Sequence, residues 1–144
     1  MSYVFDASSI LTLTRELGEN VLDLVEKNFT SPLAYYEIGN GLWKECNLLK
    51  RLNLDEAVKA LKFTFSLLHL MNVIDTEDIS LGAKTLSNAS KLDITYYDAA
   101  YLSIASELGR PLVTDDEKLA IAAEKIGVRT LQSKSFIRKG APSS

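Results

Sequence analysis

Short apolar segments alternate with longer stretches of helical periodicity along this chain. The apolar segments cover residues 3–6, 72–75, 111–114 and 128–131, and each has the length of a short strand. Strands that alternate with helices are typical of βαβ units, which form a mainly parallel sheet. The sequence therefore predicts an α/β fold with a central sheet of four to five strands.

Helical patterns occupy the intervals between these strands. We expect helices directly after Asp6 and over residues 20–27, 31–51, 54–70, 77–90, 95–108 and 116–126. Ser31 is expected to cap the third helix, with Pro32 at its first helical position. Gly109 and Gly127 stand where helices commonly end. Apolar residues recur at a helical period along 54–70, so we expect that helix to be largely buried.

The length and composition fit one globular domain. The chain has 144 residues, of which 47% are hydrophobic, and this is enough for one full core. We place the domain over residues 1–131. The last stretch combines basic residues with Gly, Pro and Ser, so residues 132–144 are expected to form a basic, partly ordered tail.

The sequence excludes several classes of protein and of site. Its apolar runs are regularly broken by charge, so we expect no membrane-spanning helix. The start, MSYVFDASS, lacks the basic region and the cleavage site of an export signal, so we expect a cytoplasmic protein. One cysteine and one histidine exclude an internal disulfide and the usual zinc sites, so any metal must be held by oxygen.

The net charge of −3 does not decide the partner. A nucleic-acid-binding protein normally carries a basic surface, which argues against such a partner. If four acids belong to a metal site, however, the other residues carry a net charge of about +1, and bound cations neutralise the site itself.

Carboxylates stand where two of the predicted strands end. Asp6 closes the first strand, and Asp115 and Asp116 follow the third. The carboxyl ends of parallel strands line the crevice where ligands bind, so these acids point to one edge of the sheet. Glu37 and Asp98 stand near the starts of two helices, beside apolar or aromatic neighbours.

A purely structural role is the alternative for each acid. Asp6 suits the N-cap of the first helix, and Thr95 with Asp98 has the spacing of a capping box. Thr114 and Glu117 have the same spacing at the start of the last predicted helix. Taken singly, an acid at such a position is more often a cap than a catalytic group.

Glu37 has a separate alternative. On a helical projection it lies with Asn40 and Lys44 opposite the apolar face, where all three could be solvated. The whole set of acids favours a site, because carboxylates brought together raise one another's pKa and cost stability unless cations bind. Mg²⁺ and Mn²⁺ prefer oxygen ligands, and Mg²⁺ keeps several waters, so a few carboxylates suffice.

Four short motifs resemble those of PIN-domain nucleases, specifically the VapC-like toxins of toxin–antitoxin pairs. They are Asp6-Ala7-Ser8 after the first strand, the E-x-x-N of Glu37 and Asn40, Asp98 in YYDAAYLSIA, and Asp116 in VTDDEKL. Each motif alone is weak. Together they follow the family's order from Tyr3 to about Leu131, in register with the strand and helix pattern.

The resemblance implies an α/β/α sandwich with an acidic pocket at the carboxyl ends of its strands. It implies an endoribonuclease that depends on Mg²⁺ or Mn²⁺, hydrolyses RNA phosphodiester bonds and acts as the toxin of a toxin–antitoxin pair. It also implies homodimers, and a small VapB-like antitoxin that reaches into the pocket and inhibits cleavage.

The resemblance also assigns roles to residues. The catalytic and metal-binding acids that it implies are Asp6, Glu37, Asp98 and Asp116. Ser8 and Thr114 match the family's accessory hydroxyls and, with Asn40, are expected to contact the substrate. The family pattern T-x-D selects Asp116, although the adjacent Asp115 could reach the site if the turn differs by one residue.

Three other functions compete with this interpretation. A phosphatase of the haloacid dehalogenase type also opens with a strand that ends on Asp, but its second Asp, two residues later, is here Ser8. A phosphoacceptor receiver domain needs an acid doublet after its first strand, and this chain has none there. A PIN-like binding scaffold without catalysis is the third, and the presence of all four acids argues against it.

Overall fold

The computed structural model describes residues 1–140, the last three by their backbone alone. Within these residues, five parallel strands form one sheet in the order β3-β2-β1-β4-β5. The strands are β1 (Val4–Phe5), β2 (Phe29–Thr30), β3 (Asn72–Val73), β4 (Leu112–Val113) and β5 (Thr130–Leu131). Because neighbouring strands are parallel, all their carboxyl ends lie at the same edge.

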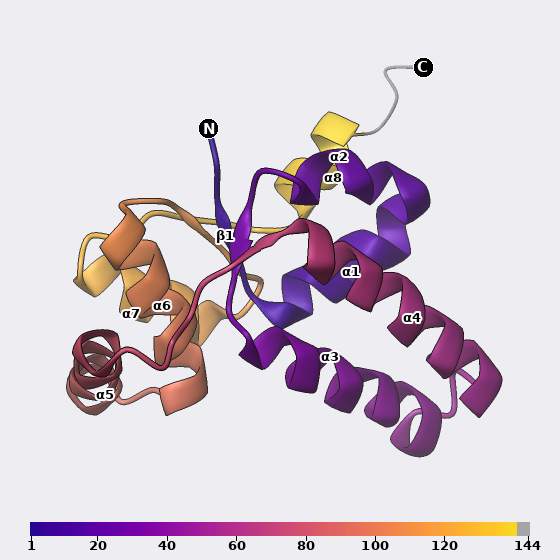
Figure 1. The fold of residues 1–144 in the computed structure, drawn as a ribbon, viewed down its shortest axis with the longest axis horizontal. Coiled ribbons are helices and arrows are strands. Elements are labelled where there is room, and N and C mark those ends of the chain that lie inside the picture. Colours follow the sequence, from indigo (N-terminus) through magenta and orange to yellow (C-terminus); the bar gives the residue numbers. More distant parts are fainter. Residues whose placement is uncertain (141–144) are drawn as a thin grey trace.

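Helices cover both faces of this sheet, and Figure 1 shows β1 between the two groups. One group is α1 (Ala7–Leu17), α2 (Leu22–Val25), α3 (Leu33–Trp43), α4 (Leu54–Leu70) and α8 (Lys134–Gly140). The other is α5 (Ile79–Leu92), α6 (Tyr96–Leu108) and α7 (Glu117–Lys125). The predicted α/β/α sandwich is confirmed. Over residues 1–140, no helix has the length and apolar character needed to span a membrane.

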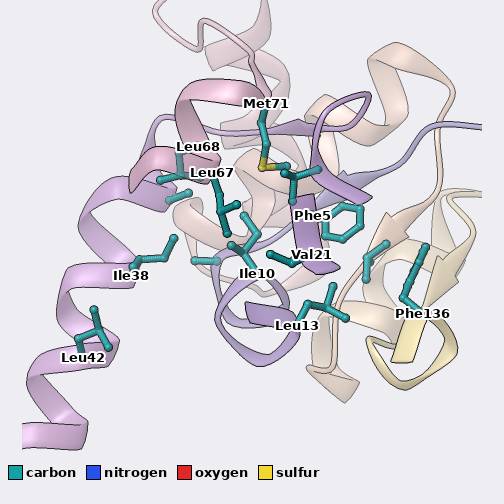
Figure 2. Close-up of a cluster of buried hydrophobic side chains, with 14 residues drawn as sticks. Phe5, Ile10, Leu13, Val21, Ile38, Leu42, Leu67, Leu68, Met71 and Phe136 are labelled. Carbon is teal, nitrogen blue, oxygen red and sulfur yellow. The ribbon is translucent and has the colours of Figure 1, made fainter. Parts of the chain in front are cut away.

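The central strands supply side chains to two separate cores. Successive side chains of a strand point to opposite faces of the sheet. Phe5 and Val113 therefore join the core under α1, α3 and α4, and Figure 2 shows Phe5 among the buried side chains of these helices. Val4 and Leu112 join the core under α6 and α7. All four side chains are fully buried, which explains why β1 and β4 are continuously apolar.

Four of the five strands lie where the sequence predicts them, although each is shorter than expected. β2 is not among the predicted strands. Only residues 28–30 separate the helix expected at 20–27 from the cap expected at Ser31, and so short a run shows no strand period. Its neighbours define it, since Val4 pairs with Phe29 and the amide of Asn72 donates to the carbonyl of Asn28 at 2.9 Å.

Several predicted helix ends differ from the structure. α3 begins at Leu33, one residue later than expected, and the hydroxyl of Ser31 accepts a hydrogen bond from the Leu33 amide at 3.1 Å. α3 ends at Trp43 and continues as a π-helical turn, η2 (Lys44–Leu48), short of the expected residue 51. The helix expected at 20–27 is split into a 3₁₀ turn, η1 (Gly18–Val21), and α2.

α4 has the predicted bounds, but the expectation that it is largely buried is wrong. Leu54 is 69% exposed and Val58 is 38% exposed, whereas Leu67 and Leu68 are fully buried. Figure 1 shows the reason, because α3 and α4 run together away from β1. The end of this pair that is distant from the sheet has no third layer to cover it.

Part of the predicted tail is helical. Phe136 of α8 is 4% exposed, and its ring lies 5.0 Å from that of Tyr3 and 5.5 Å from that of Phe5, measured between centroids. α8 therefore contributes to the first core. Residues 141–144 of the predicted tail lie outside the described residues.

Candidate acidic site

The order of the sheet reverses between β1 and β4. From β1 the chain moves outward through β2 to the edge strand β3, and it then returns to the other side of β1 to form β4 and β5. The crevice outside the carboxyl ends of two such strands is the usual ligand site of an open parallel sheet. Asp6 directly follows β1, and Thr114, Asp115 and Asp116 directly follow β4.

A hollow of about 200 Å³, here called the acidic pocket, lies at this point. Six of the seven site residues predicted from the sequence line it: Asp6, Ser8, Glu37, Asn40, Asp98 and Asp116. The seventh, Thr114, is buried at the end of β4. Residues from α1, α3, α6 and the start of α7 thus converge on one pocket, as the sequence predicts.

Asp6 is the most buried of the four acids, with 7% of its surface exposed. Its Oδ1 accepts a hydrogen bond from the amide of Ser9 at 2.9 Å and so caps α1. Burial raises the pKa of Asp6 to about 6, although hydrogen bonds from Thr114 and Ser9 act in the opposite direction. The carboxylate is therefore held at a cost that a cation would offset.

Asp116 is the N-cap of α7. Its Oδ1 accepts from the amide of Leu119 at 3.2 Å, and its own amide donates to Oγ1 of Thr114 at 3.1 Å. The capping box predicted for Thr114 and Glu117 is therefore wrong. The cap lies two residues later because Asp116, directly before the first helical residue, takes that position.

Asp98 stands in the first turn of α6. Its amide donates to Oγ1 of Thr95 at 3.1 Å, so Thr95 caps α6 through one of the two hydrogen bonds of the predicted capping box. Burial, followed by the negative charge of Asp116, raises the pKa of Asp98. Capping and a place in the pocket are not exclusive alternatives, since the helix starts bring these carboxylates to the edge of the pocket.

Glu37 lies half-buried on the pocket side of α3. The alternative in which its side chain is simply solvated, opposite the apolar face, is therefore wrong. Its Oε1 accepts a hydrogen bond from the hydroxyl of Tyr101 at 2.6 Å. Burial raises the pKa of Glu37, the bond from Tyr101 lowers it, and the charge of Asp98 raises it. Tyr101 is not among the predicted site residues, although its position one helical turn after Asp98 is a signal for it.

The two adjacent acids after β4 have different surroundings. Asp116 lines the acidic pocket, whereas Asp115 accepts hydrogen bonds from the amide and the hydroxyl of Ser133 at 2.8 and 2.6 Å. Ser133 directly precedes α8. Asp115 therefore ties the end of β4 to the C-terminal segment, and the geometry places Asp116 rather than Asp115 among the pocket acids.

Neutral groups hold the four carboxylates. The salt bridges among the described residues are all elsewhere and involve Arg15, Glu45, Arg51, Lys84 and Glu107. Lys44 lines the pocket but lies on the exposed part of its wall, and Lys118 lowers the pKa of Asp98 only as a lesser influence. The pocket is thus strongly anionic as it stands.

The chemistry of this donor set fits a hard divalent cation. All four acids offer oxygen ligands, and the raised pKa values of Asp6, Glu37 and Asp98 show that the negative charge of these three side chains is unfavourable where they lie. Across residues 1–140, no three His, Cys, Asp or Glu side chains are close enough to hold a metal ion directly. Mg²⁺ keeps several waters and is usually bound by only one or two protein carboxylates, so a magnesium site does not require three direct protein ligands.

The family follows from the match of the whole domain. A model described as "PIN domain" matches residues 3–125. The chain belongs to the PIN-domain family. Ribonuclease VapC3 of Pyrobaculum aerophilum is 33% identical over 127 residues, which cover 83% of this chain and 93% of that protein. Exonuclease VapC9 of the same organism is 34% identical over 132 residues, which cover 91% of this chain and 93% of that protein.

Solved structures agree on the fold of this VapC-like protein. The crystal structure of PAE2754 from Pyrobaculum aerophilum superposes with a TM-score of 0.78 at 24% identity, covering 98% of this chain and 96% of that one. A chain in the VapBC-1 structure from nontypeable Haemophilus influenzae gives a TM-score of 0.60 at 18% identity, covering 93% and 99%. The PIN-like fold predicted from the motifs is confirmed.

Proposed function

We propose that this PIN-domain protein is an endoribonuclease that depends on Mg²⁺ or Mn²⁺ and acts in the cytoplasm as the toxin of a toxin–antitoxin pair. The observation that carries the proposal is the acidic pocket, where four carboxylates from distant segments meet without a paired lysine or arginine among the described residues. The names of the relatives VapC3 and VapC9, a ribonuclease and an exonuclease, support a nuclease.

The acids have separate tasks in this proposal. Asp6 and Asp98 would be the principal metal ligands, and Glu37 and Asp116 would hold the metal through water. The metal supplies charge neutralisation at the phosphodiester and activation of the attacking water. Hydrolysis by water requires no covalent link to the protein and leaves 5′-phosphate and 3′-hydroxyl ends.

The remaining predicted residues either bind the RNA or hold the acids in place. Ser8 and Asn40 are exposed on the pocket wall, where they can donate hydrogen bonds to the RNA. Thr114 is buried and hydrogen-bonded near two of the acids, so we assign it to holding Asp6 and Asp116 rather than to substrate contact.

A VapB-like antitoxin and a second copy of the chain are the proposed protein partners. The similarity to a chain of the VapBC-1 structure supports an antitoxin, and the family resemblance supports a homodimer. Exposed apolar side chains on the outer part of α3 and α4, including Trp43 and Leu54, offer surface for such contacts.

The test is incubation of the purified protein with total RNA in Mg²⁺, in Mn²⁺ or in EDTA, followed by mapping of the new ends. We expect internal cuts with 5′-phosphates in either metal and none in EDTA. The release of single nucleotides from RNA ends would instead identify an exonuclease.

Asp98→Asn is the matched loss-of-function variant, and Glu107→Gln is its control on the same helix. Glu107 lies near the far end of α6 and pairs with Lys84 at 3.0 Å. We expect Asp98→Asn to remove cleavage and Glu107→Gln to retain it. Full cleavage by Asp98→Asn, or cleavage by the wild type in EDTA, would contradict the proposal. Mn²⁺ binding without cleavage of any RNA would favour the scaffold alternative.

A further inference from the structure

We propose that Tyr101 is a positioning residue that holds the carboxylate of Glu37 in place for a divalent cation in the acidic pocket. This inference rests on the proposed metal-dependent nuclease function. It concerns a residue to which neither the sequence motifs nor the family resemblance gives a role.

The hydrogen bond between the two side chains is long-range and well defined. The Tyr101 hydroxyl on α6 and Oε1 of Glu37 on α3 are 2.6 Å apart, although 64 residues separate them in the chain. A distance in this range is typical of a hydroxyl that donates to an ionised carboxylate. Tyr101 must be the donor, because an ionised carboxylate can only accept.

The Tyr101 side chain has little freedom to move. Its exposure is 1%, and it lies in the second core with Leu102 and Leu112. The phenol reaches out of that core to the wall of the acidic pocket. Glu37, by contrast, is half-buried on α3, and its long side chain has several rotatable bonds. The fixed partner therefore determines where the mobile carboxylate lies.

A neutral donor suits this task better than a cation. An arginine or lysine at this place would orient Glu37 but would also cancel its charge and compete with a bound metal. A phenol hydroxyl orients the carboxylate and leaves its negative charge intact. Oε1 is the oxygen that Tyr101 holds, so Oε2 is left to face a cation or its water.

The arrangement also connects the two layers of helices. Asp98 and Tyr101 lie one turn apart on α6, so both reach the pocket from the same face of one helix. The bond to Glu37 then connects α6 to a side chain of α3, which lies on the opposite side of the sheet. The Tyr101 hydroxyl thus links the helix that carries Asp98 to the carboxylate of Glu37.

The experiment compares Tyr101→Phe with the wild type and with Tyr35→Phe. The control removes a hydroxyl from a half-buried tyrosine on α3 that packs edge-on against Phe65 and makes no hydroxyl hydrogen bond to another described residue. Mn²⁺ affinity is measured by calorimetry without RNA at room temperature, and thermal unfolding is measured in EDTA. We expect Tyr101→Phe to weaken Mn²⁺ binding about tenfold and Tyr35→Phe to leave it within about twofold.

A second arm repeats Tyr101→Phe in a Glu37→Ala background, where there is no carboxylate to position. There we expect Tyr101→Phe to change Mn²⁺ affinity by less than about twofold, because the two residues act as a unit. A merely structural hydrogen bond would lower the unfolding temperature and leave the Mn²⁺ affinity of the folded protein unchanged.

The outcomes separate this inference from the proposed function. If the wild type binds Mn²⁺ and cleaves RNA, but Tyr101→Phe binds Mn²⁺ as tightly as the wild type, only the role of Tyr101 is overturned. The same follows if Tyr101→Phe weakens binding equally with and without Glu37. A wild type that neither binds Mn²⁺ nor cleaves RNA overturns both proposals.

Discussion

Two hollows at opposite ends of the sheet are lined by side chains of opposite charge. At the carboxyl ends of β1 and β4, a hollow of about 200 Å³ is lined by four acids. At the amino ends, a larger hollow of about 330 Å³ is lined by Arg110 and Arg129 and, as far as the described residues go, by no carboxylate. The larger hollow gathers no acids that could hold a cation, so the size of a hollow does not identify the site.

The direction of the helices accounts for this separation. α1, α6 and α7 begin at the acidic end, where the partial positive charge of a helix start favours Asp6, Asp98 and Asp116. α6 and α7 end at the other side of the sheet, and Arg110 and Arg129 follow these two helices in the chain. The direction of the helices thus accounts for the acids at the one hollow and brings the two arginines to the other.

The largest effect is expected when one acid of the pocket is neutralised. Asp6→Asn should lower kcat/KM for RNA cleavage in Mg²⁺ at least about a thousandfold, because metal-assisted chemistry supplies several kcal/mol. Arg129→Gln, at the opposite end of the sheet, should stay within about twofold. Steady-state kinetics on one RNA substrate checks both variants. Similar losses in the two variants would show that the charge separation has no bearing on catalysis.

The next effect concerns stability in metal-free buffer. Asp6 has its pKa raised from 3.8 to about 6, so the folded chain binds this proton more tightly than the unfolded chain. The free energy of unfolding should therefore fall as the pH rises from about 4 to about 6, and Asp6→Asn should be more stable by up to about 3 kcal/mol at neutral pH.

Urea unfolding in EDTA measures this effect, with both proteins followed from about pH 4 to pH 8. The difference between the two curves isolates Asp6, since every other titrating group is shared. A variant that is less stable than the wild type at neutral pH would contradict the assignment of unfavourable burial to Asp6.

The two adjacent acids after β4 should show smaller and complementary effects. One variant should lose stability and the other should lose cleavage activity. Asp115→Asn weakens the hydrogen bonds from Ser133, so the free energy of unfolding should fall by about 1–3 kcal/mol while cleavage stays within about threefold. Asp116→Asn keeps a residue that can cap α7, so stability should change little while cleavage falls about ten- to a hundredfold. Denaturant melts and cleavage rates for the two variants decide which acid belongs to the site.

The smallest effect is expected at the arginine end of the sheet. Arg110 is exposed and takes part in no salt bridge within the described residues, so Arg110→Gln should change the free energy of unfolding by less than about 0.5 kcal/mol. Chemical denaturation in EDTA is the measurement. A larger loss would mean that this end of the sheet also depends on its charge.

Much of the fold could be predicted because it rests on local patterns. β1 and β4 are buried on both faces and must be apolar, so the runs ending at Phe5 and Val113 stand out from their surroundings. β2 could not be predicted, because a strand of two residues has no period and exists only through its pairing with β1 and β3.

The candidate site was predictable for the acids at the ends of elements. Asp6 and Asp98 precede or open a helix, and parallel strands bring such positions to one edge. The sequence leaves the place of Glu37 open, since a helical projection shows which residues share a face but not what that face packs against. Tyr101 has no assigned role in the sequence, because its bond to Glu37 depends on how the sheet brings α6 and α3, from its opposite faces, to the same pocket.

By itself, the sequence determined the alternation of strands and helices, the candidate acids Asp6, Glu37 and Asp98 with the pair Asp115 and Asp116, and the edge of the sheet to which the acids after the strands point. Only the tertiary structure decided that Asp116 rather than Asp115 faces the pocket, that Glu37 is half-buried and that Tyr101 holds it. The physical reason is the distance along the chain over which each interaction acts. Periodicity and capping act over a few residues, whereas these contacts join side chains that are 18 and 64 residues apart in the chain.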